Sequence, residues 1–277
     1  MTISELLKKY STHELGNEIE ILLGHVLGQS KEFLYMNGDY VLTATEAKRI
    51  EELAEERIEK ETPIAYLTGY KNFYGLNFKV NKNVLIPRPE TEWIVDESLR
   101  ILAKKQKVSG RKTLRVLDVG TGSGAIAVSI AFNSDASKVQ VFASDISDKA
   151  LSVAKRNALA AKANITFYKA GLLSGLKGKF DIIIANLPYV PESDYKKLYE
   201  NLKHEPKLAL SDGTDDFVLI KKLVNQLRTH LNKDAIVLLE IDPKASDMKA
   251  NGFKKTVIKD FKGLDRFIKL SLTKRTK

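Results

Sequence analysis

A short polar tetrapeptide that follows an apolar run has the residue types and spacing for chemistry on a planar nitrogen. Residues 180–185 predict a buried strand, and Asn186, Leu187, Pro188 and Tyr189 follow it directly. The side-chain carbonyl of Asn186 can accept a hydrogen bond. Leu187 precedes a proline, which favours extended backbone geometry and leaves its carbonyl available. Two acceptors beside the flat ring of Tyr189 predict a site for an amide or an exocyclic amine.

The nitrogen of such a group is a poor nucleophile because its lone pair is delocalised. Acceptors that hold both of its hydrogens favour the positive charge that develops on nitrogen as it attacks a sulfonium methyl group. Alignment of the nitrogen with that methyl group supplies the rest of the acceleration, and no strong base is required. The catalytic candidates are therefore Asn186, Leu187, Pro188 and Tyr189.

A glycine-rich loop upstream is typical of nucleotide-binding proteins. An apolar strand at 114–119 runs into the sequence Gly-Thr-Gly-Ser-Gly at 120–124, and an apolar helix follows. Glycines at alternate positions let the backbone turn tightly and approach a ligand at the start of the helix. Asp145 ends the next predicted strand, where a carboxylate can accept both hydroxyls of a ribose.

The residue before this loop distinguishes between two nucleoside cofactors. Dinucleotide-binding loops usually read GxGxxG and hold a pyrophosphate, which the carboxylate of Asp118 would repel. The same carboxylate would attract the ammonium group of an amino-acid tail, so charge favours S-adenosylmethionine over NAD. The candidate cofactor-binding residues are Asp118, Gly120, Thr121, Gly122, Ser123, Gly124, Asp145 and Asn186.

Alternating strands and helices must position these residues. The alternation predicts an α/β fold with a Rossmann-like, mostly parallel sheet covered on both faces. The last two of seven strands lack a helix between them and predict an antiparallel terminal hairpin. The strands are expected at 114–119, 139–145, 164–168, 180–185, 235–241, 254–259 and 265–271. The helices are expected at 124–132, 147–161, 215–230 and 244–250.

The N-terminal part predicts a small helical unit. Thr43 and Glu46 form a capping box, and the helix they start should end before Thr62-Pro63. Alternating segments at 78–80 and 84–86 then predict a β-hairpin.

A helix over 91–103 and a polar loop over 104–112 should lead into the sheet. We therefore expect three parts: a helical substrate-recognition domain at 1–75, a β-hairpin and helix linker region at 76–112, and a methyltransferase domain at 113–277.

Several longer segments resemble one family of enzymes. The Asp-x-Gly-x-Gly-x-Gly and Asn-x-Pro-Tyr motifs are similar to those of amino-methylating S-adenosylmethionine methyltransferases of class I. The segments at 63–69, 73–75, 86–92, 116–127 and 205–210 resemble the PrmC/HemK family of protein-(glutamine-N5) methyltransferases. Members of that family methylate the glutamine of the GGQ loop of peptide chain release factors and so support translation termination.

The resemblance implies a role for each matching position. Residues 120–124 would line the methionine part of the cofactor, and Asp145 would bind its ribose. Gly171 and Leu172 would lie beside the adenine, although the acidic residue that usually precedes them is missing. Leu187 replaces the first proline of the usual Asn-Pro-Pro-Tyr. The implied substrate-binding residues are Arg88, Pro89, Glu90, Thr91, Asn186, Leu187, Pro188 and Tyr189.

Composition limits the other function classes. The 277 residues contain no cysteine and four scattered histidines, which excludes thiolate metal sites and cysteine nucleophiles and makes a zinc site unexpected. No apolar run approaches the roughly 18 residues that cross a bilayer, and no secretory signal is evident. We therefore expect a cytoplasmic protein that uses no metal, and, because no self-complementary apolar patch is evident, a monomer.

A runner-up function remains open. The spelling Asn-Leu-Pro-Tyr resembles rRNA adenine-N6 dimethyltransferases, and a net charge of +10 suits an anionic partner. Those enzymes place their glycine loop close to the N-terminus, whereas here it begins at Gly120, and they lack the 86–92 signature. We therefore expect release factors as partners, no nucleic-acid substrate, and S-adenosylhomocysteine as the product of the cofactor. A third class, a non-catalytic cofactor-binding module, would need the pocket at Asn186 to be blocked.

Overall fold

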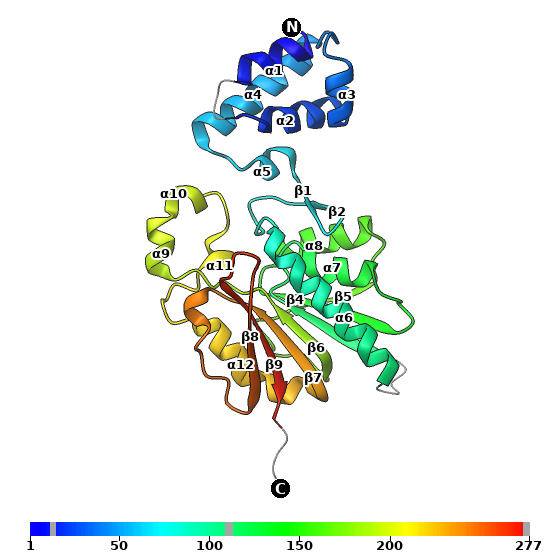
Figure 1. Ribbon diagram of the computed structural model, residues 1–277, viewed down its shortest axis with the longest axis vertical. Coiled ribbons are helices and arrows are strands. Elements are labelled where there is room, and N and C mark those ends of the chain that lie inside the picture. Colours follow the sequence, from blue (N-terminus) through cyan, green and yellow to red (C-terminus); the bar gives the residue numbers. More distant parts are fainter. Residues whose placement is uncertain (12–14, 109–112, 274–277) are drawn as a thin grey trace. The chain divides into compact units, whose positions relative to one another are not determined.

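Two units, Met1–Tyr70 and Lys71–Lys277, make up the chain in the computed structural model, which describes residues 1–11, 15–108 and 113–273 (Figure 1). The linker region expected at 76–112 belongs to the second unit, and its last four residues, 109–112, lie outside the described residues, as do 274–277. The expected domain boundaries stay predictions.

The first unit is helical. Its helices are α1 (Ile3–Ser11), α2 (Glu18–Leu27), α3 (Lys31–Met36), α4 (Ala44–Lys60) and α5 (Ile64–Thr68). The Thr43 hydroxyl accepts a hydrogen bond from the Glu46 backbone N–H, and the Glu46 carboxylate accepts one from the Thr43 N–H, which completes the predicted capping box at the start of α4. Leucine and isoleucine side chains from α1, α2 and α4 form the buried core of this unit.

The second unit is built around the predicted seven-stranded sheet. Its strands are β3 (Leu114–Val119), β4 (Val139–Asp145), β5 (Ile165–Lys169), β6 (Phe180–Ala185), β7 (Leu231–Glu240), β8 (Phe253–Lys259) and β9 (Asp265–Leu272). They lie in the order β5-β4-β3-β6-β7-β9-β8. The first five in this order are parallel, and β9 and β8 are antiparallel to their neighbours. The predicted fold class, including the antiparallel terminal hairpin, is confirmed.

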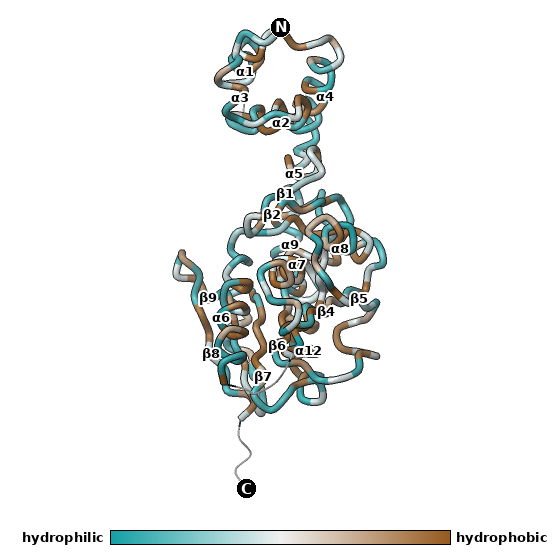
Figure 2. The backbone as a smooth tube through the Cα atoms, turned by 90° about the vertical axis from the view of Figure 1, so that its right-hand side faces the viewer, coloured by the Kyte–Doolittle hydropathy of each residue, from teal (hydrophilic) through white to brown (hydrophobic). Residues whose placement is uncertain are grey.

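Helices cover both faces of this sheet. They are α6 (Glu92–Val108), α7 (Ala125–Phe132), α8 (Asp148–Ala160) and α12 (Val218–His230). Along β6, Ile183 and Ala185 belong to the core that α12 completes, whereas Ile182 and Ile184 belong to the core beneath α6 and α7. Every residue of β6 is therefore buried, and the central strands in Figure 2 are largely apolar. The carboxyl ends of the parallel strands meet at one edge, where ligands of such sheets bind.

The hairpin predicted around 81–83 is wrong. The observed hairpin joins β1 (Tyr70–Phe73) to β2 (Leu76–Lys79) through Tyr74 and Gly75, which have φ angles of 51° and 73°. Two positive φ angles define the turn type that best matches strand twist. Asn81 instead accepts a hydrogen bond on its side chain from the Asn83 N–H at 2.9 Å, a local turn that needs no strand pairing.

Other boundaries also differ from expectation. The helix α6 continues to Val108, so the predicted loop over 104–112 is wrong for residues 104–108, and its other four residues lie outside the described part of the chain. The helix predicted at 244–250 is wrong, because a single 3₁₀ turn, η2 (Pro243–Ala245), follows the Asp242 cap and the chain then turns. Three short helices between β6 and α12 were not predicted: α9 (Glu192–Lys197), α10 (Tyr199–Leu202) and α11 (Lys207–Leu210).

The capping box generates a prediction about the first unit. Thr43→Ala should lower the local stability of α4 by about 1 kcal/mol, because the N–H of Glu46 loses its acceptor. Hydrogen exchange of the α4 amides, followed by mass spectrometry on the full chain, measures the change. Thr45→Ala, at an exposed position in the same first turn, is the matched control. Equal exchange in both variants would contradict the assignment.

Candidate active site

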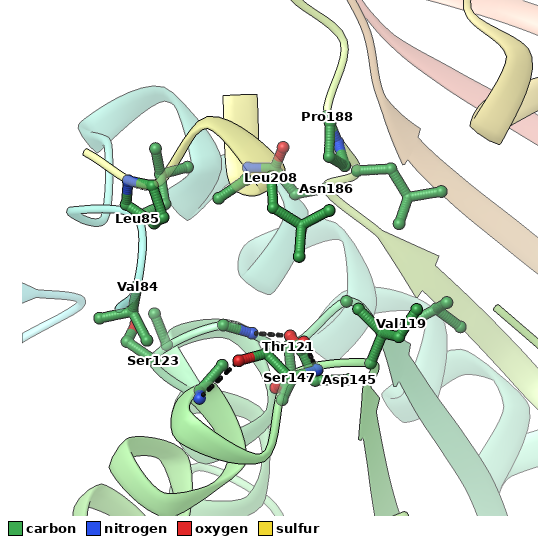
Figure 3. A pocket seen from close by; sticks show the side chains of 18 of the residues that line it. Val84, Leu85, Val119, Thr121, Ser123, Asp145, Ser147, Asn186, Pro188 and Leu208 are labelled. Carbon is green, nitrogen blue, oxygen red and sulfur yellow. Dashed lines mark hydrogen bonds between the residues drawn. The ribbon is translucent and has the colours of Figure 1, made fainter. Parts of the chain in front are cut away.

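A cavity of about 330 Å³ lies at the carboxyl edge of the sheet. Its lining comes from the loops after β3, β4, β5 and β6, and from the segments around residues 82–91 and 206–209. Figure 3 shows Thr121, Asp145 and Ser147 on one side of it and Leu85 and Leu208 on the other. The sequence-predicted residues that line it are Arg88, Thr91, Gly120, Thr121, Gly122, Ser123, Asp145, Gly171, Leu172, Asn186, Leu187 and Pro188.

Five predicted residues, all within the described part of the chain, do not line this cavity. They are Asp118, Gly124, Pro89, Glu90 and Tyr189. Gly124 packs against α8, where an added Cβ would lie 3.1 Å from the Cβ of Ala154, so its small size serves helix packing. Pro89 and Glu90 form a 3₁₀ turn, η1 (Pro89–Thr91), that leads into α6.

The glycine loop makes direct contact with the Asn186 segment. Gly120 has a φ of 73°, and an added Cβ would lie 2.9 Å from the Cδ2 of Leu187. A side chain at this position would be strained by its backbone and would also push Leu187 away. Leu187 is itself buried, so the loop after β3 and the loop after β6 are packed together.

A buried asparagine on α8 supports the same loop from behind. The Asn157 Nδ2 donates to the Ser123 carbonyl at 2.8 Å and to the Lys79 carbonyl at 3.0 Å, while its Oδ1 accepts from the Lys79 N–H at 2.8 Å. Asn157 is 3% exposed, so these bonds are shielded from water. No local sequence pattern distinguishes Asn157, because its partners are far away along the chain.

Asp145 presents a carboxylate at the cavity. Its Oδ2 accepts from the Gly122 N–H and its Oδ1 from the Ser147 N–H, each at 2.9 Å. Burial raises the pKa of Asp145, and these two backbone bonds oppose the rise. Each carboxylate oxygen keeps a further lone pair that can accept from a ligand hydroxyl.

Asp118 lies beneath the loop rather than at the cavity surface. It is 1% exposed, and the Thr121 hydroxyl donates to its Oδ2 at 2.6 Å. Its Oδ1 has no hydrogen-bond partner among the described residues. Burial raises the pKa of Asp118 to about 7, and the charge of Asp145 adds to the rise. Asp118 is therefore a buried acid whose charged form lacks full compensation.

Glu240 is the main site residue that the sequence analysis missed. The parallel register of β6 and β7 pairs Ala185 with Leu239, so the next residues, Asn186 and Glu240, lie side by side at the sheet edge. Glu240 is 1% exposed. Its only sequence signal is a carboxylate at the end of an apolar strand.

Three side chains donate hydrogen bonds to this carboxylate. The Asn186 Nδ2 and the Thr91 hydroxyl donate to Oε2 at 3.0 and 2.8 Å, and the Tyr189 hydroxyl donates to Oε1 at 2.9 Å. Burial raises the pKa of Glu240, while the bonds from Thr91 and Tyr189 oppose the rise. Burial and the neighbouring Glu240 also raise the pKa of Tyr189. Because the Nδ2 of Asn186 donates within this network, its Oδ1 is left to accept a hydrogen bond from a ligand.

A second carboxylate joins the segments that border the cavity. Glu205 accepts from the Ile86 N–H at 3.0 Å and forms an ion pair with Arg88. Both partners belong to the 86–92 motif, and Glu205 begins the 205–210 motif. The pairing joins the two motifs in space, and Pro206, Leu208 and Ala209 line the cavity together with Arg88.

No group of three or more histidine or carboxylate side chains lies together as a metal site in the described part of the chain. None of the helices there combines the length and the apolar composition needed to cross a membrane.

Comparisons with known proteins agree with this arrangement. Residues 92–238 match the methyltransferase small domain, and residues 2–69 match the PrmC N-terminal domain. The release factor glutamine methyltransferase of Bacillus cereus is 39% identical over 229 residues, which cover 81% of this chain and 79% of that protein. That of Rhodopirellula baltica is 35% identical and covers 96% of this chain and 93% of its own length. This chain belongs to the release factor glutamine methyltransferase family.

Membership in this family of glutamine methyltransferases confirms the resemblance seen in the sequence motifs. A solved structure, the hMettl16 catalytic domain in complex with the MAT2A 3'UTR hairpin 6, has a TM-score of 0.54 and covers 83% of this chain and 82% of its own. At 15% identity it shows the shared fold alone.

The buried acid beneath the glycine loop generates a prediction. Asp118 keeps its proton to about pH 7 in the folded protein, whereas an unfolded aspartate releases it near pH 3.9. Its contribution to stability is therefore complete below about pH 4 and is lost as the pH rises through about 7. The stability of Asp118→Asn relative to the native chain should rise between pH 5 and pH 8, by at most about 3 kcal/mol.

Thermal unfolding at a series of pH values measures this difference. Asp135→Asn is the control, because hydrogen bonds from Ser137 lower the pKa of that exposed carboxyl, so it is ionised throughout this range. A stability difference for Asp118→Asn that is flat between pH 5 and pH 8 would contradict the raised pKa.

Proposed function

We propose that this chain transfers a methyl group from S-adenosylmethionine to the side-chain amide nitrogen (N5) of the glutamine in the GGQ loop of peptide chain release factors. The observation that carries the proposal is the orientation of Asn186, whose Nδ2 is held by Glu240 so that its carbonyl oxygen can serve a substrate NH₂ group. This acceptor lines the same cavity as Gly120 and Asp145. The names of the relatives support the choice of substrate.

The residues around the cavity fit the cofactor. Gly120 has no room for a side chain, Asp145 offers carboxylate lone pairs, and Asp118 has a buried oxygen without a partner among the described residues, which suits a nearby positive charge. In this proposal residues 120–124 hold the methionine part, Asp145 the ribose, and Gly171 and Leu172 border the adenine. S-adenosylmethionine, when bound, supplies an electrophilic methyl group on a positively charged sulfur.

The chain's own residues bind and orient the amide. The Asn186 Oδ1 and the carbonyl of Leu187 or Pro188 accept the two N–H groups, which favours the charge that builds on nitrogen. In the transfer a carbon–nitrogen bond would form as the carbon–sulfur bond breaks, and the sulfur would keep the electron pair in the product S-adenosylhomocysteine. The methylated nitrogen is then a strong acid and releases its extra proton to water. Tyr189 takes part through its hydrogen bond to Glu240 rather than by lining the cavity.

A labelling experiment tests the substrate. Incubation of the purified chain with tritiated S-adenosylmethionine should label a release factor, and mass spectrometry should place one methyl group on the GGQ glutamine. A release factor with that glutamine replaced by glutamate is the control and should stay unlabelled. Label in ribosomal RNA in place of the release factor would overturn the proposal and select the adenine-N6 dimethyltransferase.

Removal of the amide acceptor should reduce turnover. Asn186→Ala should lower kcat by about 30- to 1,000-fold, because one preorganised hydrogen bond to the developing charge contributes about 2–4 kcal/mol. Single-turnover rates at saturating cofactor measure the effect. Asn232→Ala is the matched control, since Asn232 bonds to Asp181 at the opposite edge of the sheet. A native rate in Asn186→Ala would refute the role of this side chain.

A side chain at Gly120 should weaken cofactor binding. We expect Gly120→Ala to raise the dissociation constant of S-adenosylmethionine by about tenfold or more, because a left-handed alanine costs about 1–2 kcal/mol and its Cβ also crowds Leu187. Calorimetric titration measures the constant.

Two further variants separate these two costs. Gly175→Ala has the same type of backbone angle, with a φ of 76°, but open space around its Cβ, and should leave the affinity unchanged. Leu187→Ala added to Gly120→Ala should restore part of the affinity. Native affinity in Gly120→Ala alone would show that the loop does not approach the cofactor.

A further inference from the structure

We propose that Glu240 is a positioning residue that sets the orientation of the Asn186 carboxamide, and that this orientation makes the site selective for a substrate nitrogen bearing two hydrogens. The inference rests on the proposed function and deepens it. Glu240 lies outside the Asn-Leu-Pro-Tyr motif, but through its hydrogen bond to Asn186 it determines which ligand groups that motif can bind.

The donors and acceptors of Asn186 and Glu240 allow only one orientation of the Asn186 carboxamide. A carboxamide presents either a carbonyl oxygen or an NH₂ group, and the two orientations differ only by a rotation about one bond. An ionised carboxylate only accepts hydrogen bonds. Because Glu240 Oε2 lies 3.0 Å from Asn186 Nδ2, rotation of the amide would set two oxygens against each other. The carbonyl oxygen is therefore left for the ligand.

A bridging hydroxyl reinforces the same orientation. The Thr91 hydroxyl donates to Glu240 Oε2 at 2.8 Å, so its oxygen is an acceptor toward the Asn186 Nδ2, which lies 3.3 Å away. Both neighbours of Nδ2 are thus acceptors. The hydroxyl of Tyr189 occupies the other oxygen of Glu240 and holds the carboxylate in place.

The groups that face Glu240 include both charges and hydrogen-bond donors. On β9, Arg266 lies close enough for its positive charge to oppose the effect of burial on the pKa of Glu240, while Glu90 on η1 acts in the opposite direction. The positive charges of Arg266 and Arg88 also face Tyr189. Thr91 and Tyr189 supply hydrogen bonds that an ionised carboxylate accepts, and a protonated one would lose one of them.

A charge-exchange experiment separates positioning from a merely structural role. Asn186→Asp places two carboxylates together, so the pair should share one proton at low pH and lose it as the pH rises. While the pair keeps the proton, the substituted side chain can donate to Glu240 and still present a carbonyl oxygen, so activity should survive. At pH 9 both groups are ionised and repel each other, and kcat should fall by at least 100-fold relative to the native chain.

The second substitution should then restore activity. In Asn186→Asp/Glu240→Gln the new amide donates to one oxygen of the new carboxylate, which leaves the other oxygen for the substrate. We expect kcat at pH 9 to be at least tenfold higher in this double variant than in Asn186→Asp, with the KM for the cofactor unchanged. Glu97→Gln is the matched control, because Glu97 is a buried carboxylate paired with Arg100 and Lys269 away from the cavity, and it should not restore Asn186→Asp.

The outcomes are distinguishable from failure of the proposed function. A native chain that leaves the release factor unmethylated refutes that function, whatever the variants do. If the native chain is active and the double variant, with a native-like melting temperature, is no faster than Asn186→Asp at pH 9, the positioning role is overturned.

A second variant covers the case in which the double variant does not fold. Thr91→Val keeps the shape of the side chain and removes the bridging hydroxyl, so kcat should fall about three- to tenfold at unchanged cofactor KM. A native kcat in Thr91→Val would overturn the role of the network.

Discussion

A buried carboxylate surrounded by three hydrogen-bond donors determines what the substrate side of this site can bind. Glu240 receives bonds from Asn186 and Tyr189, which lie in one segment after β6, and from Thr91, which is far away in the sequence. The register of β6 and β7 brings Glu240 beside Asn186, and the 3₁₀ turn η1 brings Thr91 to both. Since a buried charge is stable only when its hydrogen bonds are satisfied, the three donors and the carboxylate stabilise each other.

The same dependence explains which parts of the site could be predicted from sequence. The glycine loop, Asp145 and Asn186 each end a strand of local apolar pattern, so short windows of sequence were enough to find them. Glu240 required the strand order and register, which the local pattern does not contain. The position of the hairpin was predicted wrongly for a related reason. The observed turn contains Tyr74 with a positive φ, which is unusual for that residue type. The turn at Asn81 has a composition typical of hairpins, but no strand pairing accompanies it.

The departure of this chain from the usual family motif is accommodated by packing. A leucine at 187 lacks the backbone restriction of a proline, yet its side chain is buried against Gly120. The contact couples the loop after β6 to the loop after β3 through van der Waals packing rather than through chain stiffness. A leucine here is therefore compatible with a fixed acceptor geometry at Asn186, provided that position 120 has no side chain.

The two buried acids of the site are compensated to different degrees, and the difference has a consequence for how the site works. Glu240 accepts three side-chain hydrogen bonds, whereas Asp118 accepts one from Thr121 and has an oxygen with no partner among the described residues. The hydrogen bonds around Glu240 are thus in place before any ligand arrives, while the glycine loop covers an acid whose charged form would be further stabilised by positive charge nearby. A cationic ligand in the glycine loop would lower the pKa of Asp118. The ionised carboxylate would then attract the ligand, which the protonated form favoured by burial does only weakly. The ammonium group of an amino-acid tail, with which Asp118 would pair in the proposed binding mode, would supply this positive charge to a residue that does not itself reach the cavity surface.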